Sequence, residues 1–442
     1  MNAPIKKPRH VFYGWFIVVN GIVAYTLGYG ARYSFSVIFP FLLEEFRWPR
    51  DVTAAILSVQ MIFYGLVAPA TGFLMDRLGP RKTMSLGITL LAMGLALSSR
   101  ADKPWHFYLS FGILSGAGLS LTTAVPFTIV LKNWFERKRG LAFSLLSLGT
   151  GGAFACSPAI ALLVNSLSWR TTFVVEGIIV AGIMLPLVIL IVRYHPQEKG
   201  LFCDGTLEAM KSSPKTVAET AQIANHTWTS INWTLAKAVK TGRLWLLCLS
   251  AFSLWGIVQH MMVTHHIAFA VDMGYSKIYA SSVISLFGIM FICGSMFGAI
   301  SDQIGRELVM TIGTAIGISS LVVLTLIKDT SQPWMLYYYA MGFSFSLGVI
   351  HPTLIATVTD IFQGRKAGTI IGFVWFIFAV GGFIGPWLGG RIFEFSKSYV
   401  PAFIVVMLMY AVGCAAIWFA SPRKIRPVRG HVKLIRKSNY SV

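Results

Sequence analysis

Two short charged segments of this 442-residue chain repeat each other, and each lies between long apolar runs. The first reads GFLMDRLGPR over residues 72–81, and the second reads GAISDQIGR over residues 298–306. Their shared Gly, Asp and Gly are all displaced by 226 positions (298 − 72, 302 − 76 and 305 − 79). A charged turn that recurs once in each half of an apolar chain is typical of a duplicated membrane protein.

Composition supports a membrane location. The chain is 55% hydrophobic and only 12% charged, whereas soluble domains carry about 25% charged residues. So much apolar surface cannot be buried inside one chain, so lipid must cover the rest. The net charge of +20 is compatible with nucleic-acid binding, but the positive residues lie in loops and tails beside apolar segments, where they report membrane orientation. We therefore expect no nucleic-acid partner.

Apolar runs of about 20 residues, the length that spans a bilayer, predict an all-α protein with twelve transmembrane helices. One long polar stretch separates the sixth run from the seventh, and its end, residues 233–240, is amphipathic and predicts a short helix at the membrane surface. We predict four parts: a six-helix bundle (1–193), a linker (194–243), a second bundle (244–421) and a basic tail (422–442). The runs are 12–43, 53–75, 83–99, 106–131, 141–165, 173–193, 244–270, 278–301, 308–327, 334–358, 367–390 and 401–420.

The distribution of Lys and Arg predicts the orientation. One side collects most of them, as in Arg77, Arg81 and the tail, while the other side has nearly balanced charge, as in Glu44, Arg50 and Asp272. We expect an integral protein of the plasma (inner) membrane, monomeric, with both termini and the linker cytoplasmic. Sequons at Asn225 and Asn232 then lie on the unglycosylated side.

The two halves correspond beyond the charged turns. WFERKR at 134–139 corresponds to IFQGRK at 361–366, and the Gly-rich stretch with Pro158 corresponds to the one with Pro386. The halves run in the same direction, so we predict two pseudo-symmetric bundles related by an axis along the membrane normal.

The chain resembles the major facilitator superfamily, through the loop at 72–81 and its echo at 298–306. It is also similar to that superfamily's monocarboxylate transporter and oxalate–formate antiporter branch, and the likeness covers essentially the whole chain. The resemblance implies the major facilitator fold and secondary transport of organic anions, by proton coupling or exchange. The narrower likeness is carried by YGW at 13–15, RYSFSV at 32–37, WF at 134–135 with Arg139 and Gly140, HP at 195–196, KGL at 199–201, DG at 204–205, His265 and DMG at 272–274.

The chain departs from this branch in two helices. Relatives commonly carry an Arg in the eighth helix, and the oxalate type carries a Lys in the eleventh, but 278–301 and 367–390 contain no charged residue here. If a carboxylate is bound, another group must supply the positive charge.

Arg32 is the first candidate for that group, because a charge well inside an apolar run costs about 2.5–3.5 kcal/mol or more. Tyr25, Tyr29 and Arg32 share a helical face, and a guanidinium offers a carboxylate two parallel donors. The alternative is that Arg32 extends to the headgroups.

Histidines are the second candidates. His351 lies in the tenth run beside Pro352, which loosens the helix, and it can donate to an anion or exchange a proton. The alternative is an ordinary interhelical hydrogen bond. In the seventh run Gln259 and His260 lie deeper than His265 and His266, which we expect near water. α-Helical spacing puts Gln259 on the face of Trp255, with His260 one position around, and it leaves open which histidine faces a cavity.

Acidic residues have other predicted roles. Glu176 in the sixth run is expected to pair with Arg170 rather than to carry a proton. The resemblance implies that Asp76 docks near the start of helix eleven when the cytoplasmic side is closed, with Arg77 and Arg81 using partners such as Asp360. The predicted gating set is Gly72, Asp76, Arg77, Gly79, Arg81, Asp302, Arg306 and Asp360.

Together these patterns predict a secondary active transporter for a small, monocarboxylate-like organic anion, working by alternating access with lipid around it and a proton as a candidate co-substrate. Predicted substrate-binding residues are Arg32, Tyr29, Tyr25, Gln259, His260 and His351. An efflux transporter of lipophilic compounds and a non-transporting membrane sensor are the alternatives. We expect no enzyme activity, cofactor or metal, because the sequence shows no nucleophile–base arrangement, phosphate loop or metal-ligand spacing.

Overall fold

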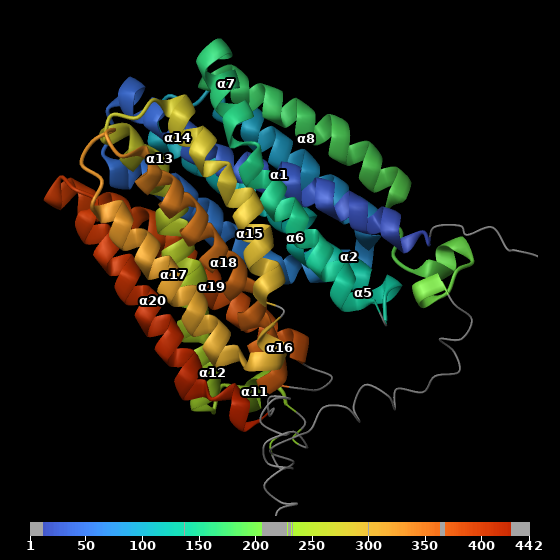
Figure 1. Ribbon diagram of the computed structural model, residues 1–442. Coiled ribbons are helices and arrows are strands. Elements are labelled where there is room, and N and C mark those ends of the chain that lie inside the picture. Colours follow the sequence, from blue (N-terminus) through green and yellow to red (C-terminus); the bar gives the residue numbers. More distant parts are fainter. Residues whose placement is uncertain are drawn as a thin grey trace, which may run out of the picture.

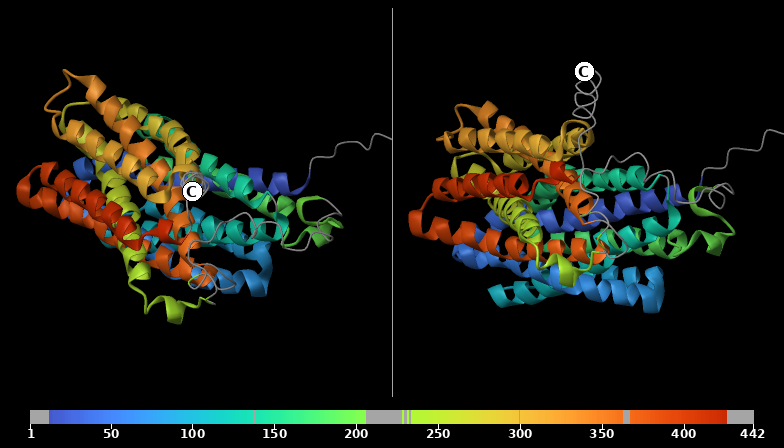
Figure 2. Two further views of the ribbon diagram at one scale, coloured as in Figure 1. Left: turned by 60° about the horizontal axis from the view of Figure 1, so that its bottom comes forward. Right: turned by 90° about the horizontal axis from the view of Figure 1, so that it is seen from below.

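The computed structural model describes residues 12–136, 138–205, 228, 231, 233–298, 300–362 and 367–425, and the described elements are all helical. Long helices run side by side in two groups (Figures 1 and 2). The N-terminal half is α1–α8 and the C-terminal half is α12–α20. The end of the bundle where α1 begins and α20 ends is called the terminal end, and the other is called the opposite end.

The N-terminal half contains short and long helical segments, and its fourth crossing is built from four consecutive segments: α3, η1, α4 and α5. Its elements are α1 (Gly14–Phe46), α2 (Arg50–Ser98), α3 (Pro104–Phe107), η1 (Tyr108–Leu114), α4 (Ser115–Thr122), α5 (Ala124–Trp134), α6 (Arg139–Ala155), α7 (Ser157–Leu167) and α8 (Trp169–Ile191). Short helices of the connecting segment are η2 (Pro196–Lys199), η3 (Cys203–Gly205) and α11 (Leu235–Ala238).

The C-terminal half begins with a crossing whose middle is a π-helix, η5. Its elements are α12 (Gly242–Ser250), η5 (Ala251–Gln259), α13 (His260–Asp272), α14 (Lys277–Ile284), α15 (Leu286–Gly298), α16 (Ser301–Ile304), α17 (Arg306–Thr325), α18 (Pro333–Ile361), α19 (Ala367–Ser396), α20 (Val400–Ala420) and η6 (Pro422–Lys424).

α2 is two membrane crossings joined by a tight reversal. Its 49 residues are interrupted at Gly79, whose φ of 76° is a left-handed conformation that glycine adopts without a Cβ penalty. Both arms lie along the same neighbouring crossing, because a Cβ on Gly116 would meet Gln60 of the first arm and one on Gly118 would meet Leu91 of the second.

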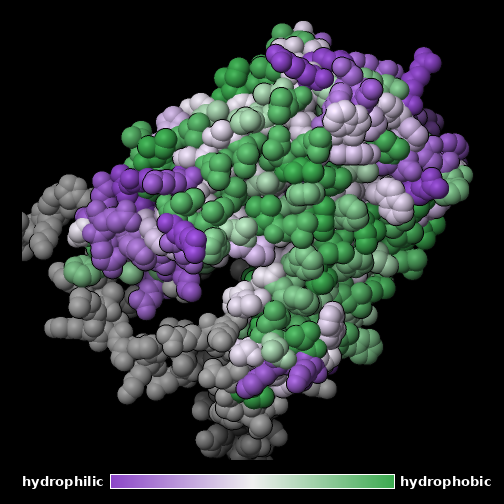
Figure 3. Space-filling model, turned by 180° about the vertical axis from the view of Figure 1, so that it is seen from behind, coloured by the Kyte–Doolittle hydropathy of each residue, from purple (hydrophilic) through white to green (hydrophobic). Residues whose placement is uncertain are grey.

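Eleven helices among the described residues are long and apolar enough to span a membrane, and α2 counts once among them. With α2 counted as two, the described residues make twelve crossings, as predicted. Apolar side chains cover the sides of the bundle, and polar side chains gather at its ends (Figure 3). Phe395, Phe419 and Met296 are 77%, 75% and 72% exposed, which suits contact with acyl chains.

The all-helical fold with membrane-spanning crossings is therefore as expected, with differences at the helix ends. α1 continues to Phe46 and α12 begins at Gly242, and the predicted surface helix is observed as the four-residue α11. The four domain boundaries stay a prediction. Asn225 and Asn232, and most of the basic tail, lie outside the described residues.

Candidate functional site

Ion pairs join the two halves at the opposite end. Arg50, the first residue of α2, donates through Nη1 and Nη2 to both carboxylate oxygens of Asp272 at the end of α13, at 2.7 and 2.9 Å. Its backbone N–H donates to Glu394 of α19 at 2.8 Å. Further pairs between the halves are Lys277 with Glu44 and Arg391 with Asp51. The halves are therefore clamped together at this end.

At the terminal end, several of the predicted gating residues contact partners in their own half. Tyr194 donates to Asp76 at 3.0 Å, and Arg81 donates to the carbonyl of Val192 at 2.7 Å. In the other half Arg306 pairs with Asp302 and Asp360. The surface is hollowed between the halves at this end (Figure 3), and this hollow is called the cleft below.

In this conformation, which is open at the terminal end, the gating contacts expected for Asp76 and Asp360 are not formed among the described residues. Asp76 contacts Tyr194 of its own half, and Asp360 contacts Arg306 rather than standing as a partner of Arg77 or Arg81. Arg77 lies over the ring of Phe73 at 4.4 Å from its centroid. The expected contacts belong to a conformation closed at the terminal end, so the gating roles stay predictions. Gly72 and Gly79 have open space where a Cβ would lie.

Arg32 points into the protein. Its side chain is almost fully buried (4% exposed), its Nη2 lies 2.9 Å from the sulfur of Met61, and its guanidinium carbon lies 5.9 Å from the ring centroid of Tyr64. Among the described residues, no carboxylate forms an ion pair with Arg32. A buried cation without an anionic partner is costly unless something compensates it.

His260 reaches the same place from the C-terminal half. A Cβ on Gly382 of α19 would meet Met61 Cγ at 2.5 Å and His260 Nδ1 at 3.3 Å, so the two halves meet beside Arg32. The π-helix η5 places His260 here, because Nδ1 lies 2.9 Å from the carbonyl of Trp255, five residues back. A carbonyl only accepts, so Nδ1 carries the proton and Nε2 is left as the other polar atom. Arg32, Met61, His260 and Gly382 thus lie together where the two halves meet, and we infer that they form the floor of the cleft.

Gln259 also crosses between the halves. Its Nε2 lies 3.5 Å from the hydroxyl of Tyr33, and the two residues are 226 positions apart, the displacement of the repeated turns. Residues related by a two-fold axis touch each other only where they lie on that axis. This contact therefore marks where the predicted axis passes between α1 and the seventh crossing.

His351 lies in an aromatic group of the C-terminal half. Its ring stacks on Trp255 at a centroid distance of 4.4 Å, and Phe291 and Trp375 lie at 6.0 and 6.1 Å. The side chain is half-buried. Because its neighbours come from three other helical crossings of the interior, we infer that its exposed part faces the cleft.

The predicted tyrosines line the other half. Tyr25 and Tyr29 pack edge to face at 5.2 Å, and the hydroxyls of Tyr29 and Tyr64 lie 3.2 Å apart. Tyr64, which is next to Arg32, was missed by the sequence analysis, as was Met61. Both lie on the second apolar run, where an ordinary aromatic or thioether side chain gives no signal of its own.

His265 and His266 are buried, which corrects the expectation that these two residues lie near water. His265 is 1% exposed and holds helices together, with Nδ1 3.1 Å from the hydroxyl of Tyr399 and Nε2 2.8 Å from the carbonyl of Pro386. His266 is equally buried and packs on Phe287. Interhelical packing reaches this end of the seventh crossing because the halves are clamped there.

Glu176 does not pair with Arg170, contrary to expectation. Arg170 lies at the start of α8 and pairs with Glu45 and Asp102. Glu176, almost two turns further on, faces α1, and its Oε2 lies 3.0 Å from the hydroxyl of Ser34. Its Oε1 is buried without a hydrogen-bond partner among the described residues.

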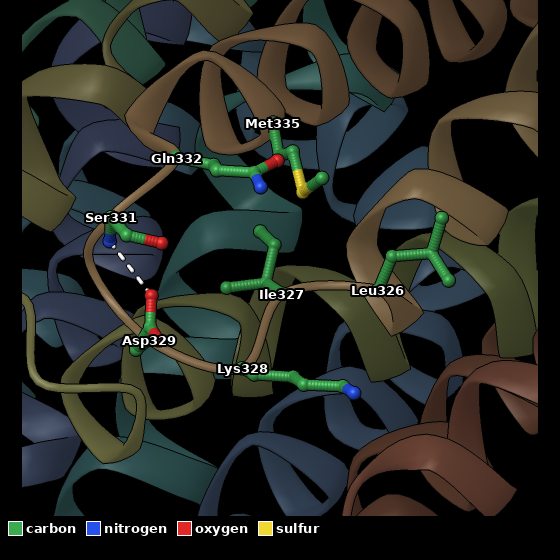
Figure 4. Close-up of a pocket in the computed structure, with 7 residues that line it drawn as sticks. All are labelled: Leu326, Ile327, Lys328, Asp329, Ser331, Gln332 and Met335. Carbon is green, nitrogen blue, oxygen red and sulfur yellow. Dashed lines mark hydrogen bonds between the residues drawn. The ribbon is translucent and has the colours of Figure 1, made fainter.

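A small surface pocket lies apart from the cleft. It is formed by the loop between α17 and α18, and the seven side chains that line it all come from the C-terminal half (Figure 4). Asp329 accepts a hydrogen bond from the backbone of Ser331 there, and hydrogen bonding to Ser331 lowers the pKa of Asp329. Because this pocket does not lie between the two halves and Arg32 does not line it, we do not regard it as a transport site.

The clamp at the opposite end was also missed. The sequence did hold a signal for it, because charges on that side are nearly balanced, as pairs between halves require. What the sequence lacks is the partner of each charge, since Arg50 and Asp272 are 222 residues apart.

The sequence profile of the Major Facilitator Superfamily matches residues 21–386, and a second match covers 297–438. The uncharacterized MFS-type transporter YcxA of Bacillus subtilis (strain 168) is 25% identical over 410 residues, covering 91% of this chain and 93% of YcxA. Monocarboxylate transporter 13 of Bos taurus is 25% identical over 422 residues, covering 93% and 90%.

Solved structures give the same fold. A bacterial homolog of the human lysosomal transporter Spinster superposes with a TM-score of 0.68 at 15% identity, covering 93% of this chain and 97% of that one. A mutant of the nucleoside transporter NupG gives 0.70 at 12% identity, covering 92% and 100%. The chain therefore belongs to the major facilitator superfamily, and it is similar to monocarboxylate transporters of that superfamily.

Proposed function

We propose that this membrane transporter carries a small organic anion, of the monocarboxylate type, by alternating access. The observation that carries the proposal is Arg32: a buried guanidinium, without a carboxylate partner among the described residues, on the floor of a cleft between two halves. A substrate carboxylate supplies the missing anion and accepts two parallel hydrogen bonds.

The named relatives support the same substrate class. Several curated relatives are monocarboxylate transporters, although they share only about a quarter of their residues with this chain. The cation that relatives commonly carry in the eighth helix is absent here, since residues 278–301 contain no charged residue. Lys277, at the start of α14, cannot replace it, because it binds Glu44 at the opposite end. Arg32 takes over its role as the cation that meets the substrate.

Hydrogen-bonding groups around Arg32 complete the site. His260 and Gln259 of the C-terminal half lie at the level of the floor, whereas Tyr29 and Tyr25 of the N-terminal half, together with His351, lie nearer the mouth. Since both halves contribute, binding of the anion draws them together and biases the conformational equilibrium.

The positive charge of the terminal end predicts that this end faces the cytoplasm. Both termini are then cytoplasmic, in the plasma (inner) membrane, and the cleft opens inward. Closing it requires the gating residues, with Asp76 of the N-terminal half meeting the positive end of a helix dipole in the other half, an attraction of about 0.3–1 kcal/mol. Opening the other side requires release of the Arg50 clamp.

Transport is coupled to a proton or proceeds by exchange, and the protein acts as a monomer without catalysing a reaction. Counterflow in proteoliposomes tests the transport claim. Vesicles loaded with an unlabelled carboxylate should accumulate the labelled one, with and without a pH gradient. Accumulation driven by the gradient indicates proton coupling, and counterflow that ignores the gradient indicates exchange.

Arg32→Ala should reduce counterflow about 10- to 100-fold, because hydrogen bonds to a charged group contribute about 1.5–3 kcal/mol. Arg100→Ala is the matched control, since Arg100 is an exposed arginine at the opposite end. Counterflow of Arg32→Ala equal to that of the control, at equal amounts of folded protein, would remove Arg32 from the site. A lipophilic drug as the sole transported compound would instead favour the efflux alternative.

A further inference from the structure

We propose that the cleft selects monocarboxylates that carry an aromatic group, with the carboxylate on Arg32 and the ring between two aromatic walls. The inference rests on the proposed function and names the substrate class of the same site. Each wall comes from one half of the protein and lies between the floor and the mouth of the cleft.

The C-terminal wall is a continuous group of four rings. Trp255 lies 4.4 Å from His351 and 5.1 Å from Trp375, and Trp375 lies 5.2 Å from Phe378. Trp255 and Phe378 are buried behind the surface, whereas His351 and Trp375 are half-buried. The exposed faces are thus presented on a rigid backing of further rings.

The N-terminal wall is made of tyrosines. Tyr25 packs edge to face on Tyr29, and Tyr29 is linked to Tyr64 through their hydroxyls. Tyr25 and Tyr29 are half-buried. Aromatic rings favour stacked or edge-to-face neighbours at about 4.5–7 Å, so a ring that enters between these walls meets partners on both sides.

Helix geometry gives the height of the walls above the floor. Tyr29 and Tyr25 precede Arg32 by three and seven residues, and Trp375 precedes Gly382 by seven. At about 1.5 Å per residue, the walls extend from roughly 4.5 to 10.5 Å toward the mouth. A carboxylic acid of two or three carbons that is bound at Arg32 extends no further than about one helical turn, roughly 5 Å, toward the mouth. Such an acid hardly reaches the two walls. A ring attached to the same acid lies between them.

Matched pairs of acids test the inference. Proteoliposomes loaded with pyruvate or phenylpyruvate, or with acetate or phenylacetate, are assayed for counterflow of the labelled phenyl acid and for inhibition by each member. The assay is run at neutral pH with protein-free vesicles as the leak control. Burial of the ring should make each phenyl acid about 10- to 100-fold more potent than its short partner.

The variant Trp375→Ala should reduce this potency ratio to less than about 3-fold, and Trp375→Phe should restore most of it. Trp334→Ala, at an exposed tryptophan of α18 outside the cleft, should keep the wild-type ratio. If Trp375→Ala does not fold, the wild-type pairs and Trp375→Phe still decide the question.

A wild-type ratio near one, with pyruvate and acetate transported, overturns the aromatic selection and leaves the carboxylate site standing. Phenyl acids that inhibit without being transported also overturn it, since they are then not substrates. A high ratio that Trp375→Ala leaves unchanged overturns the placement of the ring. Failure of all four acids to exchange overturns the proposed function itself.

Discussion

The clamp at the opposite end should set the balance between the two open conformations, and Arg50→Ala is the perturbation that tests this. The Arg50 guanidinium makes two parallel bonds to Asp272 and one to the hydroxyl of Tyr399 at 2.7 Å. It also lies 3.8 Å from the ring centroid of Phe393. The substitution removes these contacts but keeps the backbone bond to Glu394.

The size of the effect follows from the exposure of the pair. The side chains of Arg50 and Asp272 are 16% and 29% exposed, so they are partly screened, between the 0.2–1 kcal/mol of exposed pairs and the 3–5 kcal/mol lost when a buried pair is broken. We take about 2 kcal/mol for the whole group, which changes the conformational equilibrium constant about 30-fold. A conformation populated at about 3% would then reach about half of the molecules.

Distances between spin labels provide the assay. Labels at Lys103 and Lys328 report on the opposite end, and labels at Lys82 and Gln303 report on the terminal end; all four side chains are exposed. In Arg50→Ala the first pair should gain a longer distance and the second pair a shorter one. Arg100→Ala should resemble the wild type. Unchanged distances at both ends in Arg50→Ala would refute the clamp as a determinant of conformation.

Three further predictions concern packing, pH and the cleft. Gly381→Val should lower the free energy of unfolding in detergent by about 1–3 kcal/mol, because a Cβ at this position would lie 2.5 Å from the carbonyl oxygen of Phe252. Gly368→Ala should leave the stability unchanged, because a Cβ there would have no neighbouring atom within 4 Å. Burial and then the hydrogen bond to Asp76 raise the pKa of Tyr194, so the folded protein holds that proton more tightly. The contribution of Tyr194 to stability is therefore complete below pH about 10 and is lost as the pH rises through the folded-state pKa. Tyr194→Phe should be less stable than the wild type at pH 7 and equal to it in strong alkali. Unfolding curves at both pH values measure this difference. His351→Ala should raise the KM for a carboxylate about 5- to 10-fold by removing one hydrogen bond, and an unchanged KM in initial-rate uptake would exclude contact with the substrate.

The fold was readable from the sequence because lipid imposes a simple rule: each crossing needs a long apolar run and satisfies its own backbone. The repeated turns then gave the symmetry, and the contact between Tyr33 and Gln259 lies at their displacement. Arg32 stood out for the same reason, as a charge where charges are costly.

Interactions between distant segments were not readable. The π-helix η5 shifts the spacing so that Trp255 and His260, five residues apart, come together, whereas α-helical spacing favoured Gln259. The pairing of Arg170 with Glu45 and Asp102 rather than Glu176 likewise depends on which helix faces which. Such partners are set by packing of the halves, not by local sequence.

Equilibrium binding of a labelled monocarboxylate to the purified protein tests the central claim most directly, because it needs no transport. The wild type, Arg32→Gln, Arg32→Lys and Arg100→Ala are compared at equal amounts of folded protein. We predict that Arg32→Gln weakens binding at least about 10-fold, that Arg32→Lys retains part of the affinity, and that Arg100→Ala changes nothing. Equal affinity of Arg32→Gln and the wild type would contradict the claim that the buried guanidinium holds the substrate.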